Sequence, residues 1–256
     1  MNNYLRYFLY ISILGVFGIL LFSALINIYV NKDRIIYTLK GTTAEGRERG
    51  SSYTADTEQV ELAKKIIKGG YILYFRHAHR EKWIDVAMYD AMEATNLLKA
   101  EELYFKDAVC LSSMGIIQAQ MMGEFIKEIG LPIGKIITSP SCRSRQTSEI
   151  AFGDLGDLKQ LLLHPGPYNE NLDEFAESIK NEILSLRFEN NTNAIISAHN
   201  GVIKANVFDK IEKDFEFDLE EGGFYVIKND DGRLVLVDKF HNFQFFQQIF
   251  YPRPKE

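Results

Sequence analysis

Arg76, His77 and His79 directly follow an apolar run in this chain. The run from Tyr71 to Phe75 reads as a buried strand, and the basic residues stand where it stops. Arginine is a bidentate partner for phosphate oxygens, and histidine is suited to nucleophilic attack and proton transfer near neutral pH. An Arg-His pair at a strand end therefore suggests phosphoryl chemistry.

Two further predicted strands end in residues of the same kind. The strand over 135–138 is followed by Ser139-Pro140, which opens a helix with Arg143 in its first turn, and the strand over 194–197 is followed by His199. Ligands of open α/β sheets lie outside the carboxyl ends of the strands, and a helix N-terminus favours anions. We therefore expect the three strand ends to form one anion site.

Strands that alternate with helices must position these residues. The pattern predicts an α/β fold, a three-layer α/β/α sandwich with a mainly parallel sheet. The expected helices cover about 57–68, 112–129, 140–152 and 172–187, and the expected strands cover 71–75, 135–138, 194–197 and a hairpin of 224–228 with 234–238.

Four sequence blocks occur in a characteristic order. They are Arg76-His77-Ala78, Leu111-Ser112-x-x-Gly115-x-x-Gln118-Ala119, Ser139-Pro140-x-x-Arg143-x-x-Gln146-Thr147 and Ser197-Ala198-His199-Asn200-Gly201. With these blocks the chain resembles the histidine phosphatase superfamily, which has the phosphoglycerate-mutase-like fold, and in particular its first branch. The resemblance covers about residues 70–201.

The resemblance implies a mechanism that the chemistry of the residues also allows. His77 would attack phosphorus and become phosphohistidine, while Arg76, Arg143 and His199 would hold the phosphoryl oxygens. A proton donor to the leaving alcohol is expected at Glu170 in Tyr168-Asn169-Glu170, with Asp173 and Glu174 as reserves. The resemblance implies no metal and no cofactor.

Some residues depart from the family pattern. Ala78 replaces the usual glycine, and Asn200 replaces the aspartate of the acid-phosphatase branch, which disfavours that branch. Arg80 could bind a second anionic group of the substrate or face solvent. Residues 80–110 match no known substrate-defining segment, so the substrate can be a phosphorylated small molecule or a phosphoprotein.

Three other functions stay open beside the phosphatase. A phosphomutase would use the same site, and an inactive member of the family would only bind phosphate. A metal-dependent hydrolase could draw on a polyhistidine site, although it would leave Arg76 and Arg143 unexplained. Its candidate ligands are His77, His79, His164, His199 and His241.

Composition sets limits on the rest of the chain. The net charge of -6 over 256 residues argues against a general nucleic-acid binder. Cys110 and Cys142 are expected to make neither a disulfide framework nor a zinc site, with Cys142 in a packing role.

We expect Arg145 on the surface and His164 and His241 in structural or exposed positions. The aromatic cluster over 240–250 is expected to dock on the core.

The N-terminus differs in kind from the rest. Residues 7–30 contain no charged side chain and, as a helix, would reach roughly 36 Å, enough for a bilayer core. We expect an uncleaved single-pass anchor, with a cleaved signal peptide as the alternative. The predicted organisation is an anchor and juxtamembrane segment over 1–40, a flexible linker over 41–56 and a catalytic domain over 57–256. Basic residues after the span favour a cytoplasmic domain.

Overall fold

The computed structural model describes residues 18, 56–82, 106–165, 171–213 and 216–251. The chain divides into two compact units, residues 1–52 with 82–84, and residues 53–81 with 85–256. In the first unit only the helical Gly18 and Lys82 are described, so the predicted anchor and nearly all of the predicted linker lie outside the described residues. No helix within the described ranges is long and apolar enough to cross a bilayer.

A seven-stranded mixed sheet is the centre of the second unit, counted over the described residues. Its order is β3-β2-β4-β1-β6-β7-β5. The strand before the Arg-His pair, β1, is central, because it pairs in parallel with β4 and antiparallel with β6. The strands are β1 (Ile72–Arg76), β2 (Ile133–Thr138), β3 (Asp157–Leu158), β4 (Asn193–Ala198), β5 (Lys210–Ile211), β6 (Phe224–Asp230) and β7 (Arg233–Phe240).

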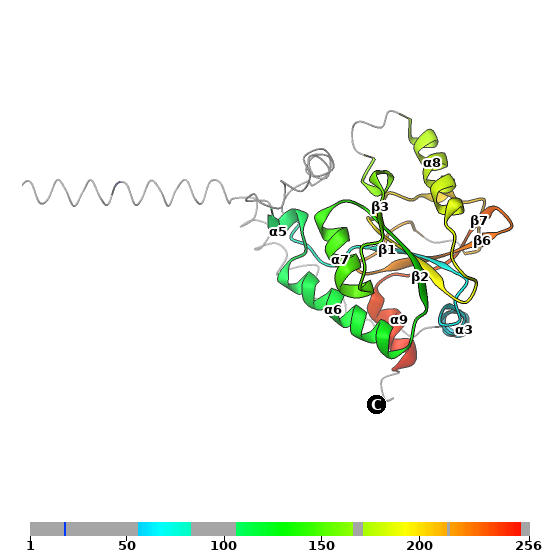
Figure 1. Cartoon of the computed structure of the whole chain (residues 1–256), viewed down its shortest axis with the longest axis horizontal. Coiled ribbons are helices and arrows are strands. Elements are labelled where there is room, and N and C mark those ends of the chain that lie inside the picture. Colours follow the sequence, from blue (N-terminus) through cyan, green and yellow to red (C-terminus); the bar gives the residue numbers. More distant parts are fainter. Residues whose placement is uncertain (1–17, 19–55, 83–105, 166–170, 214–215, 252–256) are drawn as a thin grey trace, which may run out of the picture. The chain divides into compact units, whose positions relative to one another are not determined.

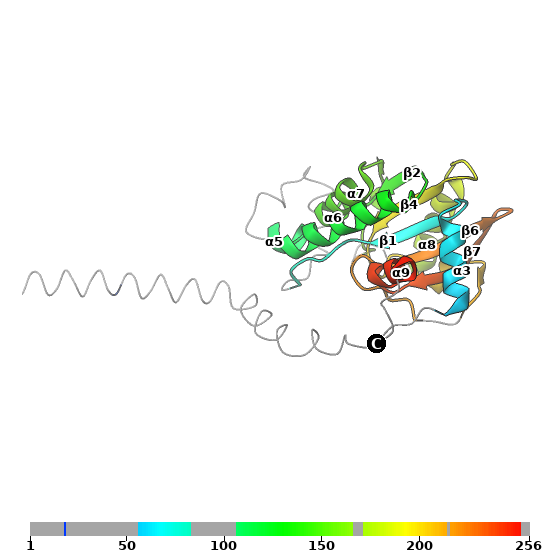
Figure 2. The same cartoon turned by 90° about the horizontal axis from the view of Figure 1, so that it is seen from below.

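Helices cover both faces of this sheet, which gives the expected three layers (Figure 1). One face carries α3 (Thr57–Ile66), α6 (Ser113–Glu128), α7 (Cys142–Phe152) and α9 (Phe243–Phe250). The other face carries α8 (Leu172–Ser185) with the short 3-10 turns η2 (Gln160–Leu162) and η3 (Ala205–Val207). Figure 2 shows α6 and α7 running beside each other, with α5 (Lys106–Val109) at the start of α6.

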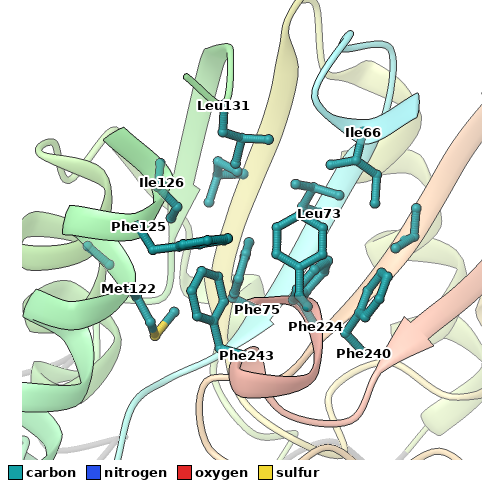
Figure 3. Packing of buried hydrophobic residues seen from close by; sticks show 14 of the residues in the cluster. Ile66, Leu73, Phe75, Met122, Phe125, Ile126, Leu131, Phe224, Phe240 and Phe243 are labelled. Atoms are coloured by element: carbon teal, nitrogen blue, oxygen red, sulfur yellow. The ribbon is translucent and has the colours of Figure 1, made fainter. Parts of the chain in front are cut away.

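Alternating side chains of β1 supply both cores. Leu73 and Phe75 face the α6 side, and Ile72 and Tyr74 face the α8 side, as the period of a strand requires. Phe243 on α9 is buried edge-on against Phe125 and packs near Phe75 (Figure 3). The predicted docking of the aromatic cluster on the core is therefore confirmed.

Several predicted element boundaries are wrong by one or two residues, and two of these shifts lie next to Arg143. Helix α7 begins at Cys142 rather than at Pro140, because the Ser141 side chain caps it by accepting from the Ser144 N–H at 3.4 Å. Strand β2 begins at Ile133, two residues before the predicted start. Both shifts leave Arg143 in the first turn of its helix.

The expectation that Cys110 and Cys142 make no disulfide framework is also wrong, because the two cysteines pair with each other. Their sulfurs form a disulfide, with 4.8 Å between the two Cα atoms. The residues are 32 positions apart, and only the packing of the end of α5 against the first turn of α7 brings them together. Both cysteines are 1% exposed, so the bond lies within the core.

Candidate active site

His77 lies at the carboxyl end of β1 with its ring fixed in one orientation. Its side chain is 3% exposed, and its Nδ1 lies 2.7 Å from the carbonyl oxygen of Ala78. A carbonyl oxygen only accepts, so Nδ1 carries the proton and donates it. The lone pair is therefore on Nε2, which is the atom available for nucleophilic attack.

The protonation state of His77 suits this task. Burial lowers the pKa of the imidazole well below its usual range, and the nearby charges of Arg143 and then Arg76 lower it further. A neutral ring at neutral pH keeps its lone pair free. His77 is thus set up as a nucleophile surrounded by positive charge, which is the environment that an anionic substrate needs.

Arg143 and His199 form the second corner of the site. The Arg143 side chain is fully buried, and one of its terminal nitrogens donates to Nδ1 of His199 at 3.1 Å. The other terminal nitrogen donates to the carbonyl of Val109 at 3.4 Å. The imidazole of His199 stands edge-on to that of His77, with 5.4 Å between ring centroids.

The tautomer of His199 follows from these contacts. A guanidinium has no acceptor, so Nδ1 of His199 must accept and Nε2 carries the proton. Nε2 lies 2.9 Å from Oγ of Ser139 and 3.2 Å from Oγ of Ser141, and each hydroxyl can accept it. His199 therefore orients Arg143 through one nitrogen and is itself held in place through the other.

Arg76 makes the third corner through the loop before β6. Its guanidinium donates to the carbonyl of Leu219 and lies 3.5 Å from a carboxylate oxygen of Glu221. Asn200 braces this loop, because its side-chain oxygen accepts from the Leu219 N–H at 3.2 Å. The Nε of Arg76 is buried and has no hydrogen-bond partner among the described residues. A phosphate oxygen could satisfy that donor.

Other residues of the sequence blocks hold the loop after the nucleophile. Oγ1 of Thr147 accepts from the Ala78 N–H at 2.9 Å, and Oε1 of Gln118 accepts from the His79 N–H at 2.8 Å. Gly115 allows α6 to approach, because a Cβ there would lie 2.0 Å from the His79 carbonyl oxygen. These block residues therefore position the site and do not line it.

The structure brings four of the predicted site residues together. Arg76, His77, Arg143 and His199 converge as described above. Arg80 donates to the carbonyls of Glu81 and Ala108, beside α5. Glu170, the expected proton donor, lies outside the described residues, and the reserves Asp173 and Glu174 are exposed in the first turn of α8.

One histidine lies beside the site although the sequence did not assign it to the phosphate site. The ring of His164 packs against that of His199 with 4.4 Å between centroids, a contact that the expectation of a structural or exposed position did not specify. His164 follows the short η2 turn in a segment without regular periodicity, and the sequence singled it out only as a ligand of the polyhistidine alternative. Arg145 is half-buried and donates through Nε to the carbonyl of Pro140 at 2.8 Å.

The histidines do not assemble into a metal site in the described part of the chain. No group of three His, Cys, Asp or Glu side chains there could hold a metal ion. His241 lies 3.6 Å from Glu220, and His79 bonds Oγ of Ser112 at 2.7 Å. The polyhistidine site considered from the sequence therefore does not form among the described residues.

A neutral histidine at a strand end, beside one fully buried and one partly buried guanidinium group, is an arrangement that suits phosphoryl transfer. No protein-family model matches the sequence, and no curated protein matches it. Similar solved structures include the protein histidine phosphatase SixA complexed with tungstate, at 13% identity and a TM-score of 0.41, covering 66% of this chain and 96% of that one.

Another similar structure is the alpha-ribazole phosphatase from Shigella flexneri. It is 13% identical, has a TM-score of 0.42, and covers 65% of this chain and 94% of that one.

Proposed function

We propose that this chain is a phosphatase that hydrolyses a phosphomonoester through a phosphohistidine on His77. The observation that carries the proposal is the neutral His77 ring, whose Nε2 lone pair is free because Nδ1 donates to Ala78. Nε2 attacks phosphorus, and the bond from phosphorus to the leaving oxygen breaks. Water then attacks the phosphohistidine, releases inorganic phosphate and returns the lone pair to Nε2.

Arg76 and Arg143 hold the phosphoryl oxygens in this proposal, and His199, whose two ring nitrogens bond Arg143 and the two serines, orients Arg143 for that contact. An oxygen bound by Arg143 competes with Nδ1 of His199 for the same terminal nitrogen. A second oxygen takes the buried Nε donor of Arg76. Both cations then stabilise the charge that is spread over the transferring group.

Glu170 stays our proposal for the acid that protonates the leaving oxygen, and Arg80 for contact with a second anionic group of the substrate. Glu170→Gln tests the acid. An alkyl phosphate should lose far more turnover than p-nitrophenyl phosphate, whose leaving group needs little protonation. Equal losses on both substrates would assign the acid to another residue.

Replacement of the nucleophile tests the reaction. His77→Ala in the full chain, solubilised in detergent, should lower kcat/KM for p-nitrophenyl phosphate at least about 10³-fold. The matched control is His241→Ala, which removes the same side-chain type outside the site and should keep activity. Acid-labile label from substrate should appear on His77 in the parent protein. Retained turnover by the His77 variant would refute the proposal.

The same assays separate the alternatives. A phosphomutase would isomerise its substrate without releasing inorganic phosphate. A metal-dependent hydrolase would lose activity on chelation and regain it with zinc or manganese. A binding module would take up phosphate and leave His77 unlabelled.

We further propose that residues 7–30 anchor the enzyme in a membrane. The support is their uncharged apolar run. The Cys110–Cys142 disulfide favours an oxidising compartment for the catalytic domain, which is the opposite of the side that the basic residues favour. Protease digestion of sealed vesicles of known orientation should cleave the domain only from the non-cytoplasmic face.

A further inference from the structure

The disulfide joins the two segments that hold Arg143. Cys142 directly precedes Arg143 at the start of α7, and Cys110 directly follows Val109, whose carbonyl accepts from the Arg143 guanidinium. The bond therefore links the residue before the arginine to the residue after its acceptor. All of these groups are buried.

The position of α5 depends on its links to α7. Helix α5 has four residues, and a helix of that length does not hold its own shape in isolation. Gln146 adds one brace, since its side-chain oxygen accepts from the Leu111 N–H at 2.8 Å. The covalent bond is the strongest constraint on the distance between the Val109 carbonyl and the first turn of α7.

We propose that Cys110 and Cys142 are positioning residues for Arg143. Their disulfide holds the Val109 carbonyl where it keeps the guanidinium extended toward His199, so that the cation meets phosphate already oriented. A dithiol would break this link. The external dithiol reduces the Cys110–Cys142 bond to two thiols and is itself oxidised to a disulfide. Helix α5 is then no longer bonded covalently to α7. The protein would then bind phosphate with full affinity only in an oxidising compartment.

A four-protein cycle tests the inference. The proteins are the parent chain, Cys110→Ala with Cys142→Ala, Arg143→Ala, and the triple variant. The measurement is the Kd for inorganic phosphate by calorimetry, with kcat/KM for p-nitrophenyl phosphate beside it. Loss of the cysteines should weaken phosphate binding about tenfold when Arg143 is present, and less than about twofold when it is absent. Equal losses in both backgrounds, or no loss, would overturn the inference.

A second comparison separates positioning from general stability. Leu62→Ala in α3 also removes buried packing but lies away from the site, so it should lower the Tm and keep the phosphate Kd. If the cysteine variant does not fold, dithiothreitol is added to the parent protein under native conditions. Phosphate affinity should fall while far-UV circular dichroism is unchanged, and should return on reoxidation. Unchanged affinity of a protein shown to be fully reduced would overturn the inference.

The turnover readout rests on the proposed function, but the binding readout does not. A parent protein that binds phosphate through the disulfide-dependent arginine yet forms no phosphohistidine would refute only the phosphatase. If the parent protein is labelled on His77 but its phosphate Kd does not change when the two cysteines are removed, only the positioning role is refuted.

Discussion

The two arginines of the site are held in different ways. Arg143 is fully buried at the start of a helix, donates to the neutral acceptors Val109 and His199, and is joined to its surroundings through the disulfide. Arg76 is more exposed and lies beside the carboxylate of Glu221. Arg143 also has the larger effect on the pKa of His77. One cation is therefore set rigidly in the core, and the other already shares its charge with an acidic neighbour.

The sharpest test of this difference is removal of each arginine. Arg143→Ala should lower kcat/KM about 10³-fold, and Arg76→Ala about 10²-fold, because the buried cation stabilises transferring charge more strongly. Steady-state kinetics with p-nitrophenyl phosphate give both values. Arg145→Ala, on the same helix as Arg143, is the control and should stay within about threefold. Equal losses of kcat/KM for Arg143→Ala and Arg76→Ala would show that the two cations contribute equally.

The pH dependence of stability gives a second test. The folded-state pKa of His77 is depressed, so the stability that its neutral ring contributes is present above about pH 6.5 and is lost as pH falls below that value. At pH 5 the loss should approach about 2 kcal/mol relative to His77→Asn. Unfolding by urea between pH 5 and 7.5 measures it.

The pKa of His77 gives a third test of the difference between the two arginines. Arg143→Ala should relieve the depressed pKa of His77 more than Arg76→Ala does, because the larger of the two charge effects disappears. NMR titration of labelled histidine follows that pKa directly. A larger shift in the Arg76 variant would reverse the order of the two cations.

The smallest expected effect is a gain of affinity. Glu221→Gln removes the carboxylate beside Arg76, so the phosphate Kd should fall about two- to fivefold. Glu220→Gln is the matched comparison, because Glu220 lies next in the chain, accepts from Asn242 and acts more weakly on Arg76 than Glu221 does, so its affinity gain should be smaller. Unchanged affinity in the Glu221 variant would mean that Arg76 is not restrained by its acidic neighbour.

Local patterns were sufficient to predict the parts of the fold that depend on local chemistry. The apolar run before Arg76 predicted β1 to within one residue, and the Gly130 stop predicted the end of α6. The convergence of Arg76, His77, Arg143 and His199 followed from a rule about strand ends. That rule needs only the direction of each strand.

Contacts between segments that are distant in the chain could not be predicted from local sequence patterns. The Cys110–Cys142 bond and the packing of the His164 ring against that of His199 depend on how α5, α7 and the η2 turn pack together. The brace from Asn200 through Leu219 to Arg76 joins two loops of different elements. The two-residue strands β3 and β5 carry too few side chains to show a period.

The hydrogen bond from Tyr74 to the His199 carbonyl joins residues 125 positions apart. Strand β1 comes early in the second unit, yet both of its neighbours in the sheet are made late. Sheets built from such distant pairings form slowly, because a long loop must close before any contact stabilises it. A growing chain therefore contains His77 long before β4 and β6 complete the site around it. Acquisition of phosphate affinity would mark the moment at which the newly made domain is complete.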